Sequence, residues 1–341
     1  SGGGDGRRWS ARRSEIARVY HGASCQNWTM ATIVNSDNFV RAENDRMLHD
    51  LQRDAGGVNL FLHNRTPAAI DKQTVIRLNR DTLYSFAVVD ISQGASFTIP
   101  EYGSRYFSAM VVNQDHLINR TFHDPGTYDL TVEEFGSPYV VLAVRILIDP
   151  ADQADLAEVS AIQDRLELRS NSTTPFEIAE YDETSFSVTR NALLELARLL
   201  TGFDHMFGSK EETEPVRHLI GTAAGWGGLP SSEASYIGVD PKLPAGQYEL
   251  TVADVPVDGF WSISVYNAAG YFEPNERDAY TINNITGAHN PDGSVTVRFG
   301  DWPEGTPNAI PTPEGWNYLV RLDGPRAERR DGSWAFPTIQ P

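Results

Sequence analysis

Hydrophobic and polar residues alternate with a period of two over much of the chain, as in half-buried β-strands. Gly and Pro residues separate the alternating segments, which is typical of a sandwich or barrel. Residues 139–148 are almost continuously apolar, so we expect this strand to be covered on both faces. In the first half of the chain the pattern predicts strands at residues 73–78, 84–91, 96–99, 105–112, 126–132 and 139–148.

The same period of two returns in the second half. An Asp-Gly pair at 292–293 predicts a tight turn before a strand. In residues 260–267, the side chains of Trp261, Ile263 and Val265 share one face, which we expect to enter the core. The opposite face, with two serines and Tyr266, fits either a pocket wall or ordinary packing. Strands are predicted at residues 246–252, 260–267, 279–283, 294–299 and 316–322.

Helical spacing of apolar residues marks a different kind of segment. It predicts helices within residues 10–56, 151–168, 183–201 and 213–224. We therefore expect a mainly β protein with helical segments. The predicted divisions are an N-terminal helical segment at 1–56, a β-sandwich at 57–149, a helical insert at 150–234 and a second β-sandwich at 235–341.

Composition and charge limit the classes of partner. The chain has 341 residues, of which 40% are hydrophobic, enough for two folded domains. A net charge of −18 repels phosphate and anionic lipid, so we expect no nucleic-acid partner. No apolar run approaches the roughly 20 residues that span a bilayer, so we expect a soluble protein without a membrane span. The location stays unassigned, and an exported protein whose leader has been removed is one interpretation.

Two groups of motifs resemble known families. Residues 58–63, 79–85 (Asn-Arg-Asp-Thr-Leu-Tyr-Ser) and 105–106 resemble the DUF1254 family. Residues 257–262 (Val-Asp-Gly-Phe-Trp-Ser), 271–275 and 316–318 resemble the DUF1214 family. The resemblance implies an immunoglobulin-like β-sandwich, a helical insert and a C-terminal jelly roll, and it implies no settled activity. Arg80 and residues 111–116 depart from the DUF1254 pattern, so a shared substrate does not follow.

The segment at 79–85 contains the first candidate chemistry. Asp81 is a candidate base, Tyr84 a candidate donor, and Arg80 and Arg105 are candidates for holding a carboxylate. The alternative is structural: Asp81 ends a turn and pairs with Arg105, which locks the edge of the sheet.

Histidines give further candidates. His116, beside an aspartate, is a second candidate base, and with His123 it forms a weaker candidate for a metal pair. Solvated loop histidines are the structural alternative, and we predict no metal site. No Gly-x-Ser-x-Gly motif occurs, so an α/β-hydrolase triad is not expected.

Four residues complete the set of binding candidates. His218 and Trp226 lie in a glycine-rich stretch at 217–230, which predicts either close approach to a ligand or a loop packed between domains. Tyr266 and Asn267 end the strand at 260–267, where they are placed to contact a ligand or to pack in a core.

Two functional hypotheses follow. The first is a hydrolase or lyase that acts on a small carboxylated or glycosidic substrate at a cleft between the two β domains. The second is a non-catalytic ligand-binding or structural module, in which the same residues join the domains. No cofactor is identified. Unpaired sheet edges also make a homo-oligomer an expectation.

Overall fold

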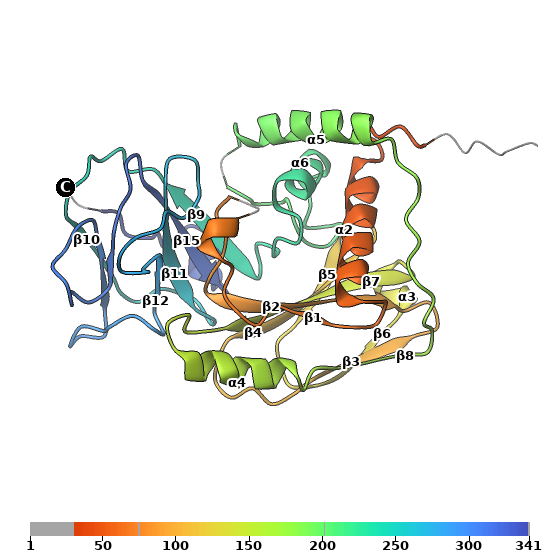
Figure 1. The fold of residues 1–341 in the computed structure, drawn as a ribbon, viewed down its shortest axis with the longest axis horizontal. Coiled ribbons are helices and arrows are strands. Elements are labelled where there is room, and N and C mark those ends of the chain that lie inside the picture. The colour runs from red at the N-terminus through yellow and green to blue at the C-terminus, as the bar shows by residue number, and fades with distance from the viewer. Residues whose placement is uncertain (1–30, 74–75, 201, 340–341) are drawn as a thin grey trace, which may run out of the picture.

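The computed structural model describes residues 31–73, 76–200 and 202–339. It is a mixed α/β fold with more strand than helix, and its sheets form an N-terminal and a C-terminal β region (Figure 1). Helices pack mainly on the N-terminal region. The predicted helical segment from residue 10 lies outside the described residues up to residue 30.

The N-terminal β region contains a five-stranded antiparallel sheet in the order β1-β2-β7-β4-β5. Its central strand β7 is buried on both faces, which confirms the prediction from its apolar run. A three-stranded sheet, β6-β3-β8, shares a hydrophobic core with one of these faces. The strands are β1 (Leu62–His63), β2 (Thr82–Asp90), β3 (Ala95–Ile99), β4 (Phe107–Asn113), β5 (Ile118–Phe122), β6 (Gly126–Leu130), β7 (Tyr139–Leu147) and β8 (Glu167–Ser170).

Helices cover both sides of this region. In Figure 1, α2 and α6 lie on one face of the large sheet, α5 lies beyond them, and α4 lies on the opposite side. Asp182 begins α5 by accepting a hydrogen bond from the backbone N–H of Ser185 at 2.7 Å. The helices are α2 (Phe39–Ala55), η1 (Ile70–Lys72), α3 (Val132–Phe135), α4 (Gln153–Gln163), α5 (Glu183–Ala197), α6 (Pro215–Gly225) and α7 (Ala327–Arg330).

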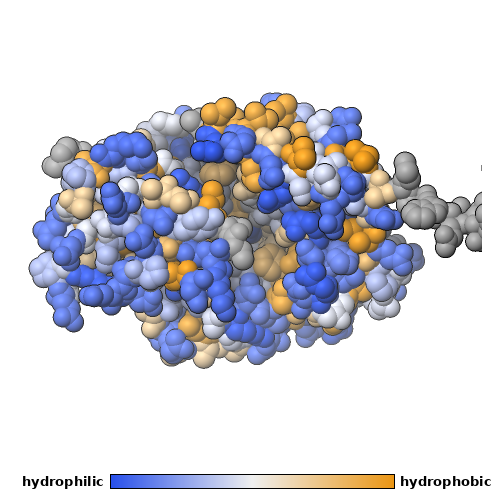
Figure 2. All heavy atoms as spheres, turned by 45° about the horizontal axis from the view of Figure 1, so that its top comes forward, coloured by the Kyte–Doolittle hydropathy of each residue, from blue (hydrophilic) through white to orange (hydrophobic). Residues whose placement is uncertain are grey.

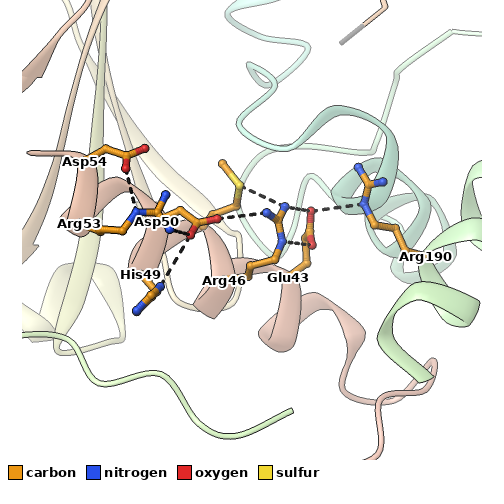
Figure 3. A network of polar contacts seen from close by, with 8 residues as sticks. Glu43, Arg46, His49, Asp50, Arg53, Asp54 and Arg190 are labelled. Atoms are coloured by element: carbon orange, nitrogen blue, oxygen red, sulfur yellow. Dashed lines mark hydrogen bonds and ion pairs between the residues drawn. The ribbon is translucent and has the colours of Figure 1, made fainter. Parts of the chain in front are cut away.

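An ion network links α2 to α5 (Figure 3). The buried carboxylate of Glu43 receives hydrogen bonds from Arg46 at 2.8 and 3.0 Å, one helical turn further on. Arg190 approaches the same carboxylate from α5, with an N···O distance of 3.7 Å. Because Glu43 is nearly closed to solvent, these two arginines offset the cost of burying its charge.

The C-terminal β region also places two sheets around one core. A four-stranded antiparallel sheet, β12-β11-β15-β9, packs against a three-stranded sheet, β10-β13-β14, whose β13–β14 pair is parallel. Trp261, Ile263 and Val265 enter this core, as the alternation predicted. The strands are β9 (Ala234–Val239), β10 (Tyr248–Val252), β11 (Trp261–Tyr266), β12 (Thr281–Asn283), β13 (Val295–Phe299), β14 (Ala309–Ile310) and β15 (Asn317–Asp323).

Three sequence-based assignments are corrected. The strand predicted at 73–78 is absent from the described part of that segment, because Arg77 turns with a φ of 54° and bonds instead to Gly270 at 2.8 Å. The helix predicted at 151–168 ends at Gln163, and Leu168 pairs with Phe97 in a sheet. Strands β1, β5, β8, β9 and β14 were not predicted. None of the helices in the described ranges is long and apolar enough to cross a bilayer.

Candidate functional site

The large N-terminal sheet places a row of polar side chains at the end that meets the C-terminal region. Tyr84 on β2 lies opposite Arg145 on β7, and Arg145 lies opposite Ser108 on β4. The next rows on this face are apolar, with Phe86, Ala143 and Met110 in contact with the helices. The polar row is therefore a local break in a buried surface.

The C-terminal sheet presents a matching row. Tyr236 on β9 lies opposite Arg321 on β15, Arg321 opposite Ser262 on β11, and Ser262 opposite Asn283 on β12. This is the face of β11 opposite the core, which the sequence left open between a pocket wall and packing. We call the combined set the junction cluster: Asp81, Tyr84, Tyr106, Ser108 and Arg145 from the N-terminal region, and Tyr236, Ser262, Tyr266, Arg321 and Asp323 from the C-terminal region.

Hydrogen bonds through this cluster join the two regions. Asp81 Oδ1 accepts from Thr281 Oγ1 at 3.0 Å and from Asn283 Nδ2 at 3.4 Å. The Tyr266 hydroxyl donates to the carbonyl oxygen of Leu78 at 2.8 Å. Arg321 donates to the Tyr266 hydroxyl and to the carbonyl oxygen of Arg77, at 2.9 and 2.7 Å. The chain segment before β2 is thus bound to the C-terminal sheet.

Several other polar atoms of the cluster have no protein partner. Arg145 is 8% exposed, and its Nη2 donates to the carbonyl oxygen of Gly227 at 2.6 Å. Within the described residues its Nη1 has no hydrogen-bond acceptor. Three further buried atoms likewise have no hydrogen-bond partner of regular geometry there: Asp81 Oδ2, Ser108 Oγ and Ser262 Oγ. Buried polar atoms are usually satisfied, so this concentration makes the cluster the candidate site.

The cluster is mostly closed to solvent, and three tyrosines are its more exposed members. Tyr84, Tyr106 and Tyr236 are only partly buried, although they lie where the two regions meet. Figure 2 shows the surface hollowed between the two regions. The Tyr84 ring lies 5.4 Å from the guanidinium carbon of Arg145 and forms one aromatic wall beside that charge.

Burial sets the protonation of Asp323. Desolvation, together with the neighbouring Asp81, raises the pKa of this carboxyl and outweighs the lowering by Arg145 and Arg321, so that its pKa is about 7. The Tyr106 hydroxyl lies near this carboxyl but makes no hydrogen bond of regular geometry. Asp323 can therefore accept or release a proton near neutral pH.

Three of the predicted site residues, Asp81, Tyr84 and Tyr266, come together in this cluster. Arg80 does not belong to it: its guanidinium donates to the carbonyl oxygen of Ala68 and lies 5.4 Å from the Tyr280 ring centre. Asn267 follows β11, and its side chain stabilises the next turn by accepting from the backbone N–H groups of Ala269 and Tyr271, each at 3.1 Å.

Arg105 differs from the structural alternative stated above. It does not pair with Asp81. Its guanidinium instead binds Asp155 at 2.7 Å and Glu158 at 3.1 Å, both on α4. The reason is local, because α4 packs on the side of the large sheet away from α2 and α6 (Figure 1), and its first turn is held at the end of β7 by a hydrogen bond from the Asp149 N–H to Asp155 at 2.7 Å. Arg105 reaches the same end of β7, where it donates to the Leu147 carbonyl oxygen at 3.1 Å. Arg105 therefore attaches α4 to the sheet.

His116, His218 and Trp226 form a separate stack outside the junction cluster. His116 is fully buried, with Nδ1 at 2.8 Å from the Thr222 hydroxyl, and its Nε2 accepts from the Gly227 N–H at 2.9 Å. Burial lowers the pKa of His116 to about 3, so it is neutral. Its ring centre lies 5.4 Å from that of His218 and 5.6 Å from that of Trp226.

The metal alternative finds no support in these contacts. His116 and His123 flank β5 at opposite ends and bind different partners. No group of three or more His, Cys, Asp or Glu side chains in the described ranges is arranged to hold a metal ion.

Sequence reasoning missed Arg145, Tyr236, Arg321 and Asp323 as site residues. Arg145 had a visible signal, because it is the only charged residue in the apolar run 139–148. A strand buried on both faces has no solvated side for a charge, so such a residue needs a polar environment. The signals for the other three were weaker, since charged and aromatic residues are ordinary in a half-exposed strand.

An ion pair at the rim also joins the regions, and it predicts a pH effect. His123 Nε2 lies 2.7 Å from Glu233 Oε2, and its Nδ1 lies 2.9 Å from the Phe107 carbonyl oxygen. Both neighbours accept, so the ring is doubly protonated. The Glu233 hydrogen bond raises the pKa of His123 above 6.5. The resulting stabilisation is complete below 6.5 and is lost as the pH rises through the raised pKa.

We expect a double-mutant cycle of His123→Gln and Glu233→Gln to give a larger coupling free energy at pH 6 than at pH 9. Urea unfolding of the four proteins at both pH values measures it. A coupling energy that is equal at the two pH values would contradict a charged pair.

The comparisons with known proteins agree with this architecture. Residues 58–170 match the family described as Protein of unknown function (DUF1254), and residues 240–327 match Protein of unknown function (DUF1214). No curated protein matches the chain. The VPA0106 protein from Vibrio parahaemolyticus has a similar fold, with 17% identity, 90% of this chain and 98% of that chain covered, and a TM-score of 0.67.

A second solved structure, an uncharacterised protein from Burkholderia cenocepacia, gives 13% identity and a TM-score of 0.49, with 96% of this chain and 93% of that chain covered. The resemblance inferred from the motifs is confirmed by the family matches. The chain thus combines a region that matches the DUF1254 family model with one that matches the DUF1214 family model.

Proposed function

We propose that this protein binds a small carboxylated molecule at the junction cluster, with Arg145 as the anion-binding residue. The observation that carries the proposal is the unpaired guanidinium edge of Arg145 in a nearly closed site. No acidic side chain of the described residues lies within the 4.0 Å ion-pair distance of this arginine or of Arg321.

The surrounding groups suit a carboxylate. An arginine presents two parallel N–H donors, which match the two oxygens of a carboxylate. Ser108, next to Arg145 across the strands, has a buried hydroxyl that lies near the Tyr106 hydroxyl without a hydrogen bond of regular geometry, and it can add a third donor. The partly buried aromatic side chains of Tyr84 and Tyr236 belong to the same cluster and favour a small ligand with some apolar surface.

Thermal unfolding of the full chain with a panel of small carboxylates tests the proposal. We expect some carboxylates to raise the unfolding temperature, and their primary amides to leave it unchanged, because a ligand that binds only the folded state stabilises it. A panel with no stabilising carboxylate, or amides that act equally, would overturn the proposal.

Arg145→Lys assigns the effect to this residue. Lysine keeps the positive charge but cannot offer two parallel donors, so we expect at least a roughly tenfold weaker affinity. Arg120→Lys is the matched control, because Arg120 lies on β5, the edge strand of the same sheet, where it pairs with Glu134 at 2.9 Å. Equal affinity for wild type and Arg145→Lys would remove Arg145 from the site.

A second candidate function is hydrolase or lyase chemistry at the same site. The raised pKa of Asp323, beside the Tyr106 hydroxyl, supports it, because a general acid or base works best near its own pKa. The test is to incubate each ligand that binds with wild type and with Asp323→Asn, and to analyse for products. If the wild type leaves every bound ligand chemically unchanged, the enzyme hypothesis fails and only the binding function remains.

The packing of sheets supports a finer view of the fold. We infer that the N-terminal region is an immunoglobulin-like sandwich and that the C-terminal region is a jelly roll, as the family resemblance implies. In each region two sheets enclose a single hydrophobic core, which favours a sandwich.

A further inference from the structure

The outer side of α5 carries a stripe of exposed apolar side chains. Its inner side packs on α2 and α6 within one hydrophobic cluster. On the outer side, Val188, Ala192 and Leu196 are exposed and follow one another at four-residue steps, so they lie on one face of the helix. Leu199 continues this face in the turn that closes the helix, where its N–H donates to the Leu196 carbonyl oxygen at 3.1 Å. We call these four residues the α5 stripe.

The stripe is the centre of a larger apolar surface. Ten large hydrophobic side chains are exposed among the described residues, and five of them lie on α5 or beside it. Three belong to the stripe, Ile33 lies beside the first turn of the helix, and Val216 lies in the first turn of α6, next to the end of α5. Figure 2 shows hydrophobic side chains along the upper part of the molecule, where α5 lies. Such a concentration usually marks an interaction surface.

Shape and charge select the kind of partner. A helix surface is convex, so it offers no hollow to a small ligand, and another helix laid along it covers it more completely. The charges beside the stripe do not favour a charged partner, because the exposed Glu195 and Arg198 pair with each other at 3.3 Å. A net charge of −18 also opposes docking on an anionic membrane. These properties favour an apolar helix face as the partner.

We propose that α5 of a second copy of this chain covers the stripe, with the two helices antiparallel about a two-fold axis. In a two-fold contact each residue and its partner exchange roles between the copies. The stripe meets this requirement when the axis passes near residue 194. Val188 then faces Leu199 of the second copy, and Ala192 faces Leu196 of the second copy, so that a small side chain meets a large one.

The size of the face sets the strength of the dimer. α5 has 15 residues, and a helix of that length is about 22 Å long and about 10 Å wide, so half of its surface is roughly 350 Å². A stable dimer buries about 800 Å² on each partner. The equal net charges of the two copies weaken the contact further, and salt screens them. We therefore expect a weak dimer, with a dissociation constant of about 10–100 μM.

Sedimentation velocity of the full chain tests for this dimer. We expect the monomer to dominate at about 1 μM and the dimer at about 500 μM, because these concentrations lie on either side of the expected dissociation constant. The dissociation constant should be lower at about 0.5 M NaCl than at about 0.05 M, since screening removes the repulsion between the copies. A monomer throughout these conditions overturns the proposal.

Leu199→Glu assigns the contact to the stripe. Leu199 is 82% exposed, so the substitution leaves the fold of each copy intact, which circular dichroism checks. It places a charge in both halves of the contact, and we expect a dissociation constant at least about tenfold higher. Ile285→Glu is the matched control, because Ile285 is 58% exposed and follows β12 in the C-terminal region. If Leu199→Glu dimerises as well as this control, another surface forms the dimer and the proposal fails.

Disulfide formation in a Cys25→Ser background tests the antiparallel register. A mixture of Val188→Cys and Leu199→Cys chains brings two thiols face to face. Either variant alone places its two thiols about 17 Å apart along the helices, much farther than the roughly 4 Å between the Cβ atoms of a disulfide. We expect the mixture to form covalent dimers several-fold faster than either variant alone. Equal rates would contradict the proposed arrangement.

A lipid surface is the alternative occupant for an exposed apolar helix face. Co-sedimentation of the full chain with neutral phosphatidylcholine vesicles distinguishes it from a second copy. We expect the protein to stay in the supernatant. Binding to the vesicles that Leu199→Glu abolishes, by a wild type that is monomeric without them, would assign the stripe to lipid and overturn the proposal.

Discussion

Replacing Arg321 with methionine is expected to lower the free energy of unfolding by about 3–5 kcal/mol. This guanidinium donates to the hydroxyls of Ser264 and Tyr266, at 2.8 and 2.9 Å. It also donates to the carbonyl oxygens of Arg77 and Leu78, at 2.7 and 3.2 Å. Methionine preserves the length of the side chain but removes all four hydrogen bonds in a buried site, and it leaves the Arg77 carbonyl without a donor among the described residues while the Leu78 carbonyl keeps only the Tyr266 hydroxyl.

The lost free energy of unfolding should come mainly from the contact between the two β regions. The acceptors at Arg77 and Leu78 belong to the segment before β2, whereas Arg321 belongs to β15. We therefore expect urea unfolding of Arg321→Met, followed by tryptophan fluorescence, to begin at lower denaturant than in wild type. Circular dichroism measured alongside shows whether the regions then unfold separately.

Arg298→Met is the matched control for this measurement. Arg298 lies on β13 of the same region and pairs with Glu249 at 2.9 Å near the surface. A partly exposed pair contributes about 0–1 kcal/mol, so this variant should stay close to wild type. If both variants lose the same amount, Arg321 does not hold the regions together in the way its hydrogen bonds indicate.

Much of the β architecture could be predicted from the sequence, because period-two alternation reports burial directly. The longer strands, such as β7 and β11, were found within one or two residues of their bounds. Short strands were missed, since the two residues of β1 cannot show a period. Residues 73–78 were assigned wrongly because Arg77 bonds across to the C-terminal region, a contact that local pattern does not report.

The candidate site was predictable only in part. Asp81, Tyr84 and Tyr266 stand in distinctive motifs, and the structure brings them together. Arg105 was chosen for its nearness to Asp81 in the sequence, but α4 supplies closer carboxylates. Arg145 and Asp323 are single charged residues on strands far apart in the chain, so their closeness depends on how two sheets meet. Sequence alternation describes each sheet separately and carries no information about that meeting.

The Asp323 carboxyl makes the stability of the protein depend on pH in a direction opposite to that of most acids. Its pKa is raised from 3.8 to about 7 in the folded chain, chiefly by burial. Between these values the unfolded chain has lost the proton while the folded chain retains it. The stabilisation is therefore complete below 3.8 and is lost as the pH rises through about 7.

The charged and titratable neighbours of Asp323 come from several elements and oppose one another. Arg145 on β7 and Arg321 on β15 lower its pKa, whereas Asp81, before β2, raises it. The Tyr106 hydroxyl, before β4, lowers the pKa slightly, and Tyr236 on β9 stays protonated because burial raises its own pKa to about 12. The Glu233 carboxylate raises the pKa of Tyr106, and it is itself hydrogen-bonded to His123.

Asp323→Asn removes this titration, so we expect the variant to gain stability relative to wild type as the pH rises from 4 to 8. A shift of about three pKa units corresponds to roughly 4 kcal/mol. Urea unfolding of both proteins at pH 4, 6 and 8 measures the difference. Asp292→Asn is the control, because hydrogen bonds from Ser294 lower the pKa of Asp292 and its titration therefore lies below this range. The difference between that variant and wild type should stay nearly constant from pH 4 to 8. An Asp323→Asn difference that stays constant with pH would mean that the carboxyl is already ionised in the folded protein, and that its charge is compensated by the arginines beside it.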